Sequence, residues 1–404
     1  MRFLFYSHDG MGLGHVRRHL AIASALVKVA PGARVLLATS IDEVSNLGLP
    51  PNVDTLKLPG LRKVANNNYC SRRLGLPRRD IHNVRSALLL ATVNSFGPAV
   101  ILVDKHPFGA GGEMAAALER GKVCGARTVL GLRDILDDTM TVVQEWSVPG
   151  VQERIVGSYD RVLVYGDPAV FDPIGQYQFG SALRKRTEFC GYVLNPPRLS
   201  PPVEPCVAQW STECATSPGV LGTTGGGEDG FALMETFILA AARAPWQALA
   251  VAGPLLEESK LEALQLLANN AQVSLSPFIP CLSELFSSTG CLVCMGGYNT
   301  LVEALSKGIP IVCVPRAAPR SEQLVRAETF QRLGLLEMIH PDKLNAELLR
   351  RRIESALETP REQILKRAGS VLSFDGAERA ANILLGLAAG AQKQPAVQMS
   401  HLAA

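Results

Sequence analysis

Gly290-CLVCMGGYNTLVEALSKGIPIVCVP-Arg316 contains the pattern of a strand, a glycine turn, a helix and a second strand. The apolar run 291–295 predicts a buried strand, and Gly296 and Gly297 predict the tight turn that follows it. A helical pattern then runs to Lys307, and another short apolar run begins near Ile311. Strands that alternate with helices form parallel sheets with crossover helices, so this segment predicts an α/β fold.

The same alternation extends in both directions from this segment. We expect strands at residues 219–223 and 247–252 and near Val273, Cys291 and Ile311. Helices are expected at residues 231–243, 259–269, 298–307 and 321–332. These elements predict one doubly wound domain over residues 218–390.

A second alternating series occupies the first half of the chain. We expect a helix at residues 16–29 and strands at residues 2–7, 33–39, 99–103, 127–132 and 161–165. These elements predict a domain over residues 1–195, joined to the other domain by a proline-rich linker at 196–217. Residues 391–404 are small and polar, which predicts a flexible tail. Two Rossmann-like domains of this kind face a central cleft, where ligands bind at the carboxyl ends of the strands.

Length and composition exclude several classes of protein. The 404 residues are 47% apolar and 19% charged, a globular balance that excludes a disordered chain or a coiled coil. The longest apolar run is interrupted by Arg243, Pro245 and Pro254, and the amino terminus lacks the pattern of a signal peptide. The nine cysteines are irregularly spaced, and we expect Cys291 and Cys294 to be core thiols on opposite faces of one strand. These features favour a cytoplasmic protein.

Positive charge gathers in one segment of the first half. The net charge of +3 is too small to indicate nucleic-acid binding, and no nucleic-acid-binding motif is present. Between Lys57 and Arg85, however, eight basic residues accompany Asp80 alone. Such a run is typical of a solvated loop. It also fits a surface for an anionic acceptor or for the inner face of a membrane, and both interpretations stay open.

A glycine-rich loop follows the first predicted strand. In Ser7-HDGMGLG-His15, Gly10, Gly12 and Gly14 let the backbone approach a ligand, and the helix that follows presents free N–H groups to it. A tight strand-to-helix turn is the alternative interpretation. A dinucleotide-binding motif with Asp42 on the ribose is disfavoured, because the glycine spacing is G-x-G-x-G.

The second half contains two more loops of this kind, at residues 221–230 and 294–304. In the later loop, backbone amides and the Thr300 hydroxyl can hold a diphosphate at the positive end of the helix. Glu303 lies one turn further along that helix, where its carboxylate can accept hydrogen bonds from both ribose hydroxyls. The alternative interpretation of Glu303 is a solvated helix residue.

These motifs together resemble the GT-B glycosyltransferases. The resemblance is carried by SPFIP at residues 276–280, by the quoted segment 290–316 and by SEQ at 321–323, with the GLGH loop at 12–15 as a looser match. The branch it resembles most contains the bacterial lipid-linked N-acetylglucosaminyltransferase of peptidoglycan synthesis and its antibiotic-glycosylating relatives. The long basic insertion in the first domain and the Gly-Gly-Tyr-Asn-Thr loop, which lacks an early Ser or His, depart from that pattern.

The resemblance implies a role for each matching residue of the second domain. Phe278 and Ile279 would lie against the nucleotide base, and Glu303 would bind the ribose. The diphosphate would contact Gly296, Gly297, Asn299 and Thr300, with the loop Thr223, Thr224 and Gly225 close by. Glu322 and Gln323 would bind the transferred sugar.

Sugar transfer needs a base that removes the proton of the acceptor hydroxyl. His15 is the candidate base, with Asp104 at the end of a predicted strand to orient the imidazole and stabilise its charged form. Asp134 is the alternative base or an acceptor ligand, and Asp104 is alternatively a structural carboxylate. Neither a D-x-D nor an HExxH motif occurs, so no metal is expected, and Arg316 or Arg320 would stabilise the leaving group.

The sequence therefore predicts an inverting, metal-independent glycosyltransferase of hexosyltransferase type. Its donor would be a UDP- or dTDP-linked sugar and its acceptor an unidentified hydroxyl compound, anionic or associated with the inner membrane surface. No cofactor beyond the nucleotide sugar is expected. A sugar-nucleotide 2-epimerase and a non-catalytic sugar-nucleotide-binding protein are the alternatives.

Overall fold

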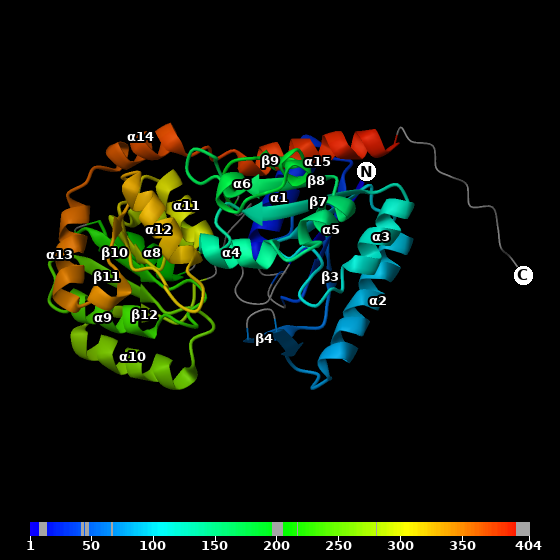
Figure 1. Ribbon diagram of the computed structural model, residues 1–404. Coiled ribbons are helices and arrows are strands. Elements are labelled where there is room, and N and C mark those ends of the chain that lie inside the picture. The colour runs from blue at the N-terminus through cyan, green and yellow to red at the C-terminus, as the bar shows by residue number, and fades with distance from the viewer. Residues whose placement is uncertain are drawn as a thin grey trace, which may run out of the picture.

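The computed structural model describes residues 1–7, 14–41, 44, 48–65, 68–195, 205–215, 217–279 and 281–392. Gly10 and Gly12 of the first glycine loop lie outside these residues. The chain forms two parallel sheets, each covered by helices, that lie side by side (Figure 1). The predicted α/β class with two Rossmann-like halves is confirmed.

The N-terminal sheet has seven parallel strands in the order β3-β2-β1-β6-β7-β8-β9. All five residues of β6 are buried, as expected for a central strand with helices on both faces. Its strands are β1 (Arg2–Tyr6), β2 (Arg34–Thr39), β3 (Val53–Lys57), β6 (Val100–Asp104), β7 (Arg127–Arg133), β8 (Arg161–Tyr165) and β9 (Thr187–Phe189). Its connections contain α1 (Gly14–Val29), the hairpin β4 (Leu61–Ala65) and β5 (Asn68–Ser71), α2 (Arg78–Phe96), α3 (Ala115–Val123), α4 (Thr139–Trp146), α5 (Val151–Ser158), α6 (Pro173–Gln176) and α7 (Ser181–Arg184).

The C-terminal sheet has six parallel strands in the order β12-β11-β10-β13-β14-β15. Its strands are β10 (Gly219–Thr223), β11 (Gln247–Val251), β12 (Ser274–Ser276), β13 (Cys291–Cys294), β14 (Ile311–Cys313) and β15 (Glu337–Met338). The helices of this half are α8 (Pro205–Glu213), α9 (Phe231–Ala241), α10 (Glu258–Ala271), η2 (Leu282–Ser288), α11 (Tyr298–Ser306), α12 (Glu322–Arg332), η3 (Pro341–Lys343), α13 (Ala346–Leu357) and α14 (Arg361–Val371). As predicted, Cys291 and Cys294 are buried and belong to core clusters on opposite faces of the sheet.

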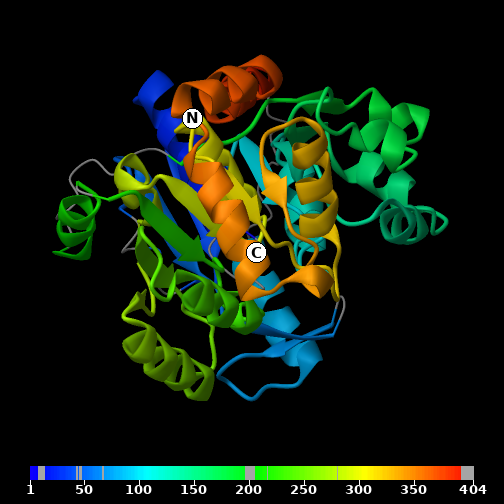
Figure 2. The same cartoon turned by 90° about the vertical axis from the view of Figure 1, so that its left-hand side faces the viewer.

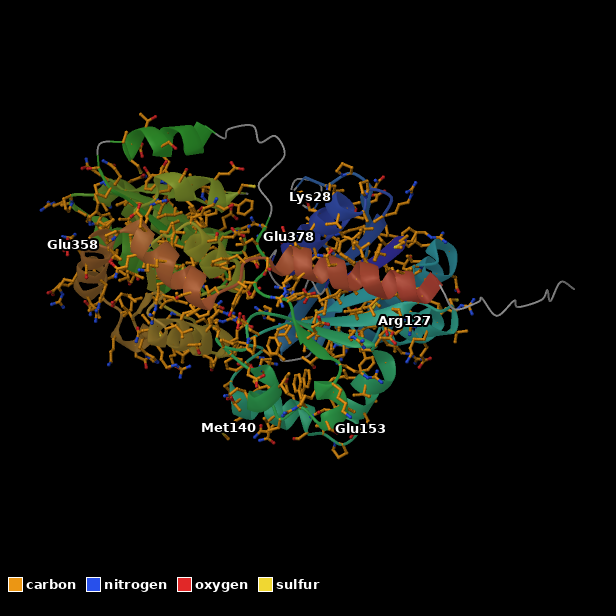
Figure 3. All side chains as sticks on the ribbon, turned by 90° about the horizontal axis from the view of Figure 1, so that it is seen from above. Lys28, Arg127, Met140, Glu153, Glu358 and Glu378 are labelled. Carbon is orange, nitrogen blue, oxygen red and sulfur yellow. The ribbon has the colours of Figure 1, made fainter. Side chains whose placement is uncertain are left out.

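The last helix, α15 (Gly376–Gln392), packs on the N-terminal half, although its residues fall within the range 218–390 predicted for the second domain. Seen from above, α15 passes Glu378 near the junction and runs over the N-terminal half, whereas Glu358 lies at the far side of the other half (Figure 3). The contact with α1 is apolar, because Ala380, Ala381 and Leu384 are fully buried. Chain order alone does not reveal this return.

The predicted proline-rich linker, residues 196–217, contains a helix, α8, which the sequence did not indicate. The helix begins at Pro205, and proline is tolerated in the first turn of a helix, where its missing N–H costs little. Trp210 is buried and joins the core, and α8 packs against η2. The cluster of prolines just before this helix obscured its pattern.

The basic segment 57–85 is also more ordered than a solvated loop. It contains the β4–β5 hairpin and the start of α2, and Arg85 is buried, with its Nε donating to Glu113 at 3.0 Å. Arg72, Arg73, Arg78 and Arg79 are exposed in and beside the loop between β5 and α2, at the lower edge of the molecule (Figure 2). Among the described helices, none is long and apolar enough to cross a membrane.

Candidate functional site

A cavity of about 680 Å³ lies between the two halves and is lined by residues from both. Each wall of the cavity lies near the strand at which the chain order of the sheet changes direction. In the N-terminal sheet β1 pairs with both β2 and β6, and in the C-terminal sheet β10 pairs with both β11 and β13. Loops diverge in opposite directions at such a point, which leaves a crevice at the carboxyl ends of the strands.

His15 lines the cavity from the first turn of α1, and Asp104 lies behind it as the last residue of β6. The Nδ1 atom of His15 is 2.8 Å from Oδ2 of Asp104. Because the ionised carboxylate can only accept a hydrogen bond, the imidazole proton lies on Nδ1. The unprotonated Nε2 is then the basic atom of His15, as general-base chemistry requires.

Arg18 joins this pair from the next turn of α1. Its Nη2 donates to Oδ2 of Asp104 at 2.7 Å and lies 2.9 Å from Nδ1 of His15. Burial alone would raise the pKa of Asp104, but Arg18 and His15 hold it well below its usual range. Burial lowers the pKa of His15 to about 4, against the opposing effect of Asp104, so the imidazole is neutral at neutral pH.

Asp134, the alternative base, is fully buried and outside the lining of the cavity. Its Oδ1 accepts from the backbone N–H of Ile135 at 2.8 Å, and its Oδ2 accepts from the Tyr192 hydroxyl at 2.8 Å. Arg326 of α12 lies 3.8 Å away. The geometry gives Asp134 a structural position at the junction of the halves, and of the two candidate bases only His15 lines the cavity.

The loop after β10 has a compact backbone conformation that requires glycine at two positions. Gly225 has a φ of 68°, and its N–H bonds to the Thr223 hydroxyl at 3.2 Å. A Cβ on Gly227 would lie 2.6 Å from the carbonyl oxygen of Ala252, so only glycine fits against the loop after β11. Thr224 lines the cavity and donates its hydroxyl to the same carbonyl oxygen.

The amino terminus of α11 follows the second predicted glycine loop of the C-terminal half, of which Met295 lines the cavity. Gly296, with a φ of 81°, opens the turn, and Gly297 caps the helix in an extended conformation. The first turn contains no acidic residue, so its N–H groups and the helix dipole favour an anion. The side chain of Asn299 donates to the carbonyl oxygen of Gly14 at 3.3 Å, which joins this turn to the first glycine loop.

Glu303 lies one turn further into α11 and is buried, with only 8% of its surface exposed. Its carboxylate accepts a hydrogen bond from Asn195, which follows the N-terminal sheet in the chain. Glu303 is not among the described residues that line the cavity, and neither are Phe278 and Ile279. Phe278 is 39% exposed and Ile279 is buried in the core.

Opposite charges join the two walls. Arg133 at the end of β7 makes two hydrogen bonds to the buried carboxylate of Glu322, one of them at 3.0 Å. Burial would raise the pKa of Glu322, but Arg133 holds it well below its usual range. Arg320 bonds to Asp137 at 2.7 Å, a second contact between the start of α12 and the N-terminal half.

The rest of the C-terminal wall is also held by polar contacts. Arg316 pairs with Asp229 at 3.1 Å, and its backbone N–H donates to the Gln323 side chain at 3.2 Å. Arg316, Glu322 and Gln323 all line the cavity.

Known proteins share this architecture. Residues 231–379 match the model of the glycosyltransferase family 28 C-terminal domain. The structure of MurG from Acinetobacter baumannii is similar with a TM-score of 0.56 and 15% identity, over 97% of this chain and 99% of that one. Glycosyltransferase VinC in complex with dTDP has a TM-score of 0.62 and 19% identity, over 96% and 100% of the two chains.

A UDP-glucose:anthocyanidin 3-O-glucosyltransferase in complex with UDP has a TM-score of 0.64 and 13% identity, over 96% of this chain and 99% of that one. No curated protein sequence matches the chain. The similar structures show that the chain has the GT-B fold, and the match to the family 28 C-terminal domain is confined to residues 231–379. In GT-B terms, the cavity lies between the two Rossmann-like halves.

The sequence identified some of the residues that line this cleft and missed a part of its N-terminal wall. Of the predicted residues, those that line the cavity are His15, Thr224, Arg316, Arg320, Glu322 and Gln323. The predicted phosphate-loop residues that do not line it are Thr223, Gly225, Gly296, Gly297, Asn299 and Thr300. Lys105 and His106 also line it, although no motif indicates them. Their position directly after Asp104, at the carboxyl end of a predicted central strand, was the available signal.

We expect kcat/KM for sugar transfer to stay near its maximum down to about pH 5 and to fall as His15 is protonated. The base is active when neutral, so activity is lost as pH falls through the pKa of about 4 rather than through the ordinary 6.5. The measurement is a pH–rate profile, with circular dichroism to confirm folding at each pH. A loss of activity near pH 6.5 would contradict the lowered pKa of His15. A His15→Ala variant with parental activity would contradict its role as the base.

Proposed function

We propose that this glycosyltransferase moves a hexosyl group from a UDP- or dTDP-linked sugar to an acceptor hydroxyl, with inversion and without a metal. The observation that carries the proposal is the placement of His15, which faces the cavity from one half while the glycine loop after β10, with Thr224, Gly226 and Gly227, faces it from the other. A single base serves a single displacement, which inverts the anomeric carbon. The UDP and dTDP in two similar structures support this class of donor.

In the proposed reaction the acceptor oxygen bonds to the anomeric carbon as its proton passes to Nε2 of His15. The bond between that carbon and the diphosphate oxygen breaks, and the nucleoside diphosphate leaves with the electron pair. The helix terminus at Gly296, Gly297, Asn299 and Thr300, together with Arg316, would stabilise the leaving charge without a metal. Asp104 would stabilise the imidazolium that forms.

We further propose that Glu322 and Gln323 bind the transferred sugar and that the loop 223–225 lies near the phosphates. Phe278 and Ile279 would contact the base, with Glu303 on the ribose. For Glu303 this role requires the carboxylate to exchange its bond from Asn195 to the ribose hydroxyls. The proposal for Glu322 requires a similar adjustment of its pairing with Arg133.

Two alternatives use the same cavity. A 2-epimerase would convert the donor sugar without any acceptor, so product analysis in the absence of acceptor separates it from a transferase. A non-catalytic protein would bind the nucleotide without turnover. The neutral, cavity-facing imidazole of His15 favours catalysis over both binding alone and a purely structural role.

We expect UDP or dTDP to bind in the presence of a chelator. Backbone N–H groups and Arg316 replace the metal as the partners of the diphosphate, so added magnesium should leave the affinity unchanged. A ligand at one hundred times its Kd should stabilise the folded state by about 2.7 kcal/mol. Calorimetry and thermal unfolding in EDTA provide the measurement. Binding that appears only when magnesium is restored would exclude the metal-independent mechanism.

Glu303→Ala should weaken nucleoside diphosphate binding by about 1.5–3 kcal/mol, the usual contribution of a hydrogen bond to a charged group. The loss should appear in donor affinity, because the ribose is not part of the reacting bond. Asn195→Ala is the matched control, since it removes the other partner of Glu303 and leaves the carboxylate available. If calorimetry gave Glu303→Ala the parental Kd, Glu303 would not be the ribose ligand.

We also propose that the loop between β5 and α2 contacts an anionic membrane surface on the cytoplasmic side. Leu74 is 61% exposed and Leu76 is 36% exposed, and the exposed residues Arg72, Arg73, Arg78 and Arg79 precede and follow them in the chain. Exposed leucines beside arginines suit an interface in which apolar side chains enter the lipid and cations meet its headgroups. Of the two interpretations of the basic segment 57–85, this arrangement therefore favours a lipid surface over an anionic acceptor.

The protein should co-sediment with phosphatidylglycerol vesicles and not with phosphatidylcholine vesicles, because the arginines require anionic headgroups. Leu74→Ser with Leu76→Ser should abolish the co-sedimentation. Leu266→Ser is the control, since Leu266 is 66% exposed on α10 in the other half. Equal sedimentation of the double variant and the parent would refute the assignment of this loop.

A further inference from the structure

Lys105 directly follows Asp104 and has an unusual backbone conformation. Its φ of 68° lies in the left-handed region, which costs free energy for a residue with a side chain. Its N–H donates to the carbonyl oxygen of Gly131 on β7 at 2.8 Å, which fixes that conformation. The other described non-glycine residues with positive φ are Asn52, Gln178, Arg243 and Gln272, and of all five only Lys105 lines the cavity.

The loop that follows is held from behind by a buried carboxylate. Glu113 accepts hydrogen bonds from the N–H of Gly111 at 2.7 Å, from the Tyr6 hydroxyl at 2.7 Å and from Nε of Arg85 at 3.0 Å. A Cβ on Gly109 would lie 2.7 Å from the Glu113 carboxyl carbon, so the loop closes tightly around that carboxylate. Lys105 therefore begins a loop that Glu113 holds in place from behind, and it lines the cavity.

The charges around Lys105 indicate what it faces. Burial would raise the pKa of Glu322, and Lys105 is one of the cations that lower it, after Arg133 and Arg326. Burial and then the charge of Lys105 hold the pKa of the neighbouring His106 well below its usual range. Lys105 lines the same cavity as His15 and Glu322, so its positive charge lies on the wall near both.

The two walls carry different cations. The C-terminal wall has Arg316, and the proposed diphosphate site at the amino terminus of α11 follows the lining residue Met295. On the wall that contains the base, Arg133 is paired with Glu322, and Lys105 is one residue from the aspartate that orients His15. The same wall presents the apolar side chains of Leu136, Val142 and Trp146.

We propose that Lys105 binds an anionic group of the acceptor, a phosphate or a carboxylate close to the hydroxyl that His15 deprotonates. This inference rests on the proposed transferase function. Because Lys105 adopts a left-handed conformation directly after β6, the end of this strand presents two functional groups. Asp104 lies behind His15, and Lys105 lines the cavity. The acceptor would then be an anionic hydroxyl compound with an apolar portion over Leu136 and Trp146.

The test is Lys105→Gly, because glycine adopts a φ of 68° without strain and the variant keeps the fold. With the protein saturated in UDP, we expect the variant to bind methyl phosphate or acetate at least about tenfold more weakly than the parent, since a charged hydrogen bond is lost. The preferred probe of the two identifies the anion. UDP affinity should be unchanged, and Lys105→Arg should retain the anion.

Gln272→Gly is the matched control, because Gln272 has a φ of 57° at the end of α10, away from the cavity. It should relieve the same backbone strain and bind the anions as the parent does. The inference would be overturned if Lys105→Gly bound the anions as tightly as the parent protein does. It would also be overturned if the parent protein bound neither methyl phosphate nor acetate. Weaker UDP binding by Lys105→Gly would also overturn it, by assigning Lys105 to the donor. A parent that failed to bind any nucleoside diphosphate would instead refute the proposed function.

Discussion

The buried ion pair between Arg18 and Asp104 connects the proposed base, His15, to the core of both halves. Both side chains are almost completely buried, 2.7 Å apart. The guanidinium of Arg18 lies 5.0 Å from the ring centroid of Tyr165 on β8 and 5.5 Å from that of Tyr298 on α11. Removal of one partner from a buried pair typically costs about 3–5 kcal/mol, because the other charge is left without compensation. The orientation of His15 and the packing of α11 therefore depend on the same ion pair, Arg18 with Asp104.

This arrangement explains how two walls from different halves form one site. Tyr298 begins α11, whose first turn is the proposed diphosphate site, and its hydroxyl accepts the N–H of Val193 at 3.0 Å. Arg326 donates to the carbonyl oxygens of Gly296 and Ile135, one from each half. The polar contacts that join the halves are thus the same contacts that fix the loops of the cleft. A shift of one half against the other would change the distance between base and donor directly.

The sequence predicted those elements whose patterns are local. The strand bounds 161–165 and 219–223 and the pairing of His15 with Asp104 agree with the structure, because strand ends of a parallel sheet meet at one edge. Features that depend on distant residues were not predictable. The bond of Glu303 to Asn195, the burial of Arg85 beside Glu113 and the backbone of Lys105 each require knowledge of a partner far along the chain or of a strained conformation. Local composition misled where prolines preceded α8.

The return of α15 to the N-terminal half has a consequence for synthesis of the protein. Helix α1 ends at Val29 and its covering helix begins at Gly376, so 376 − 29 = 347 positions separate them. At roughly 5–20 residues per second, about 17–70 seconds pass before the ribosome supplies that cover. During this interval the apolar face of α1 has no partner from α15, and the C-terminal half can fold first. The N-terminal half reaches its final packing only when the last helix leaves the ribosome.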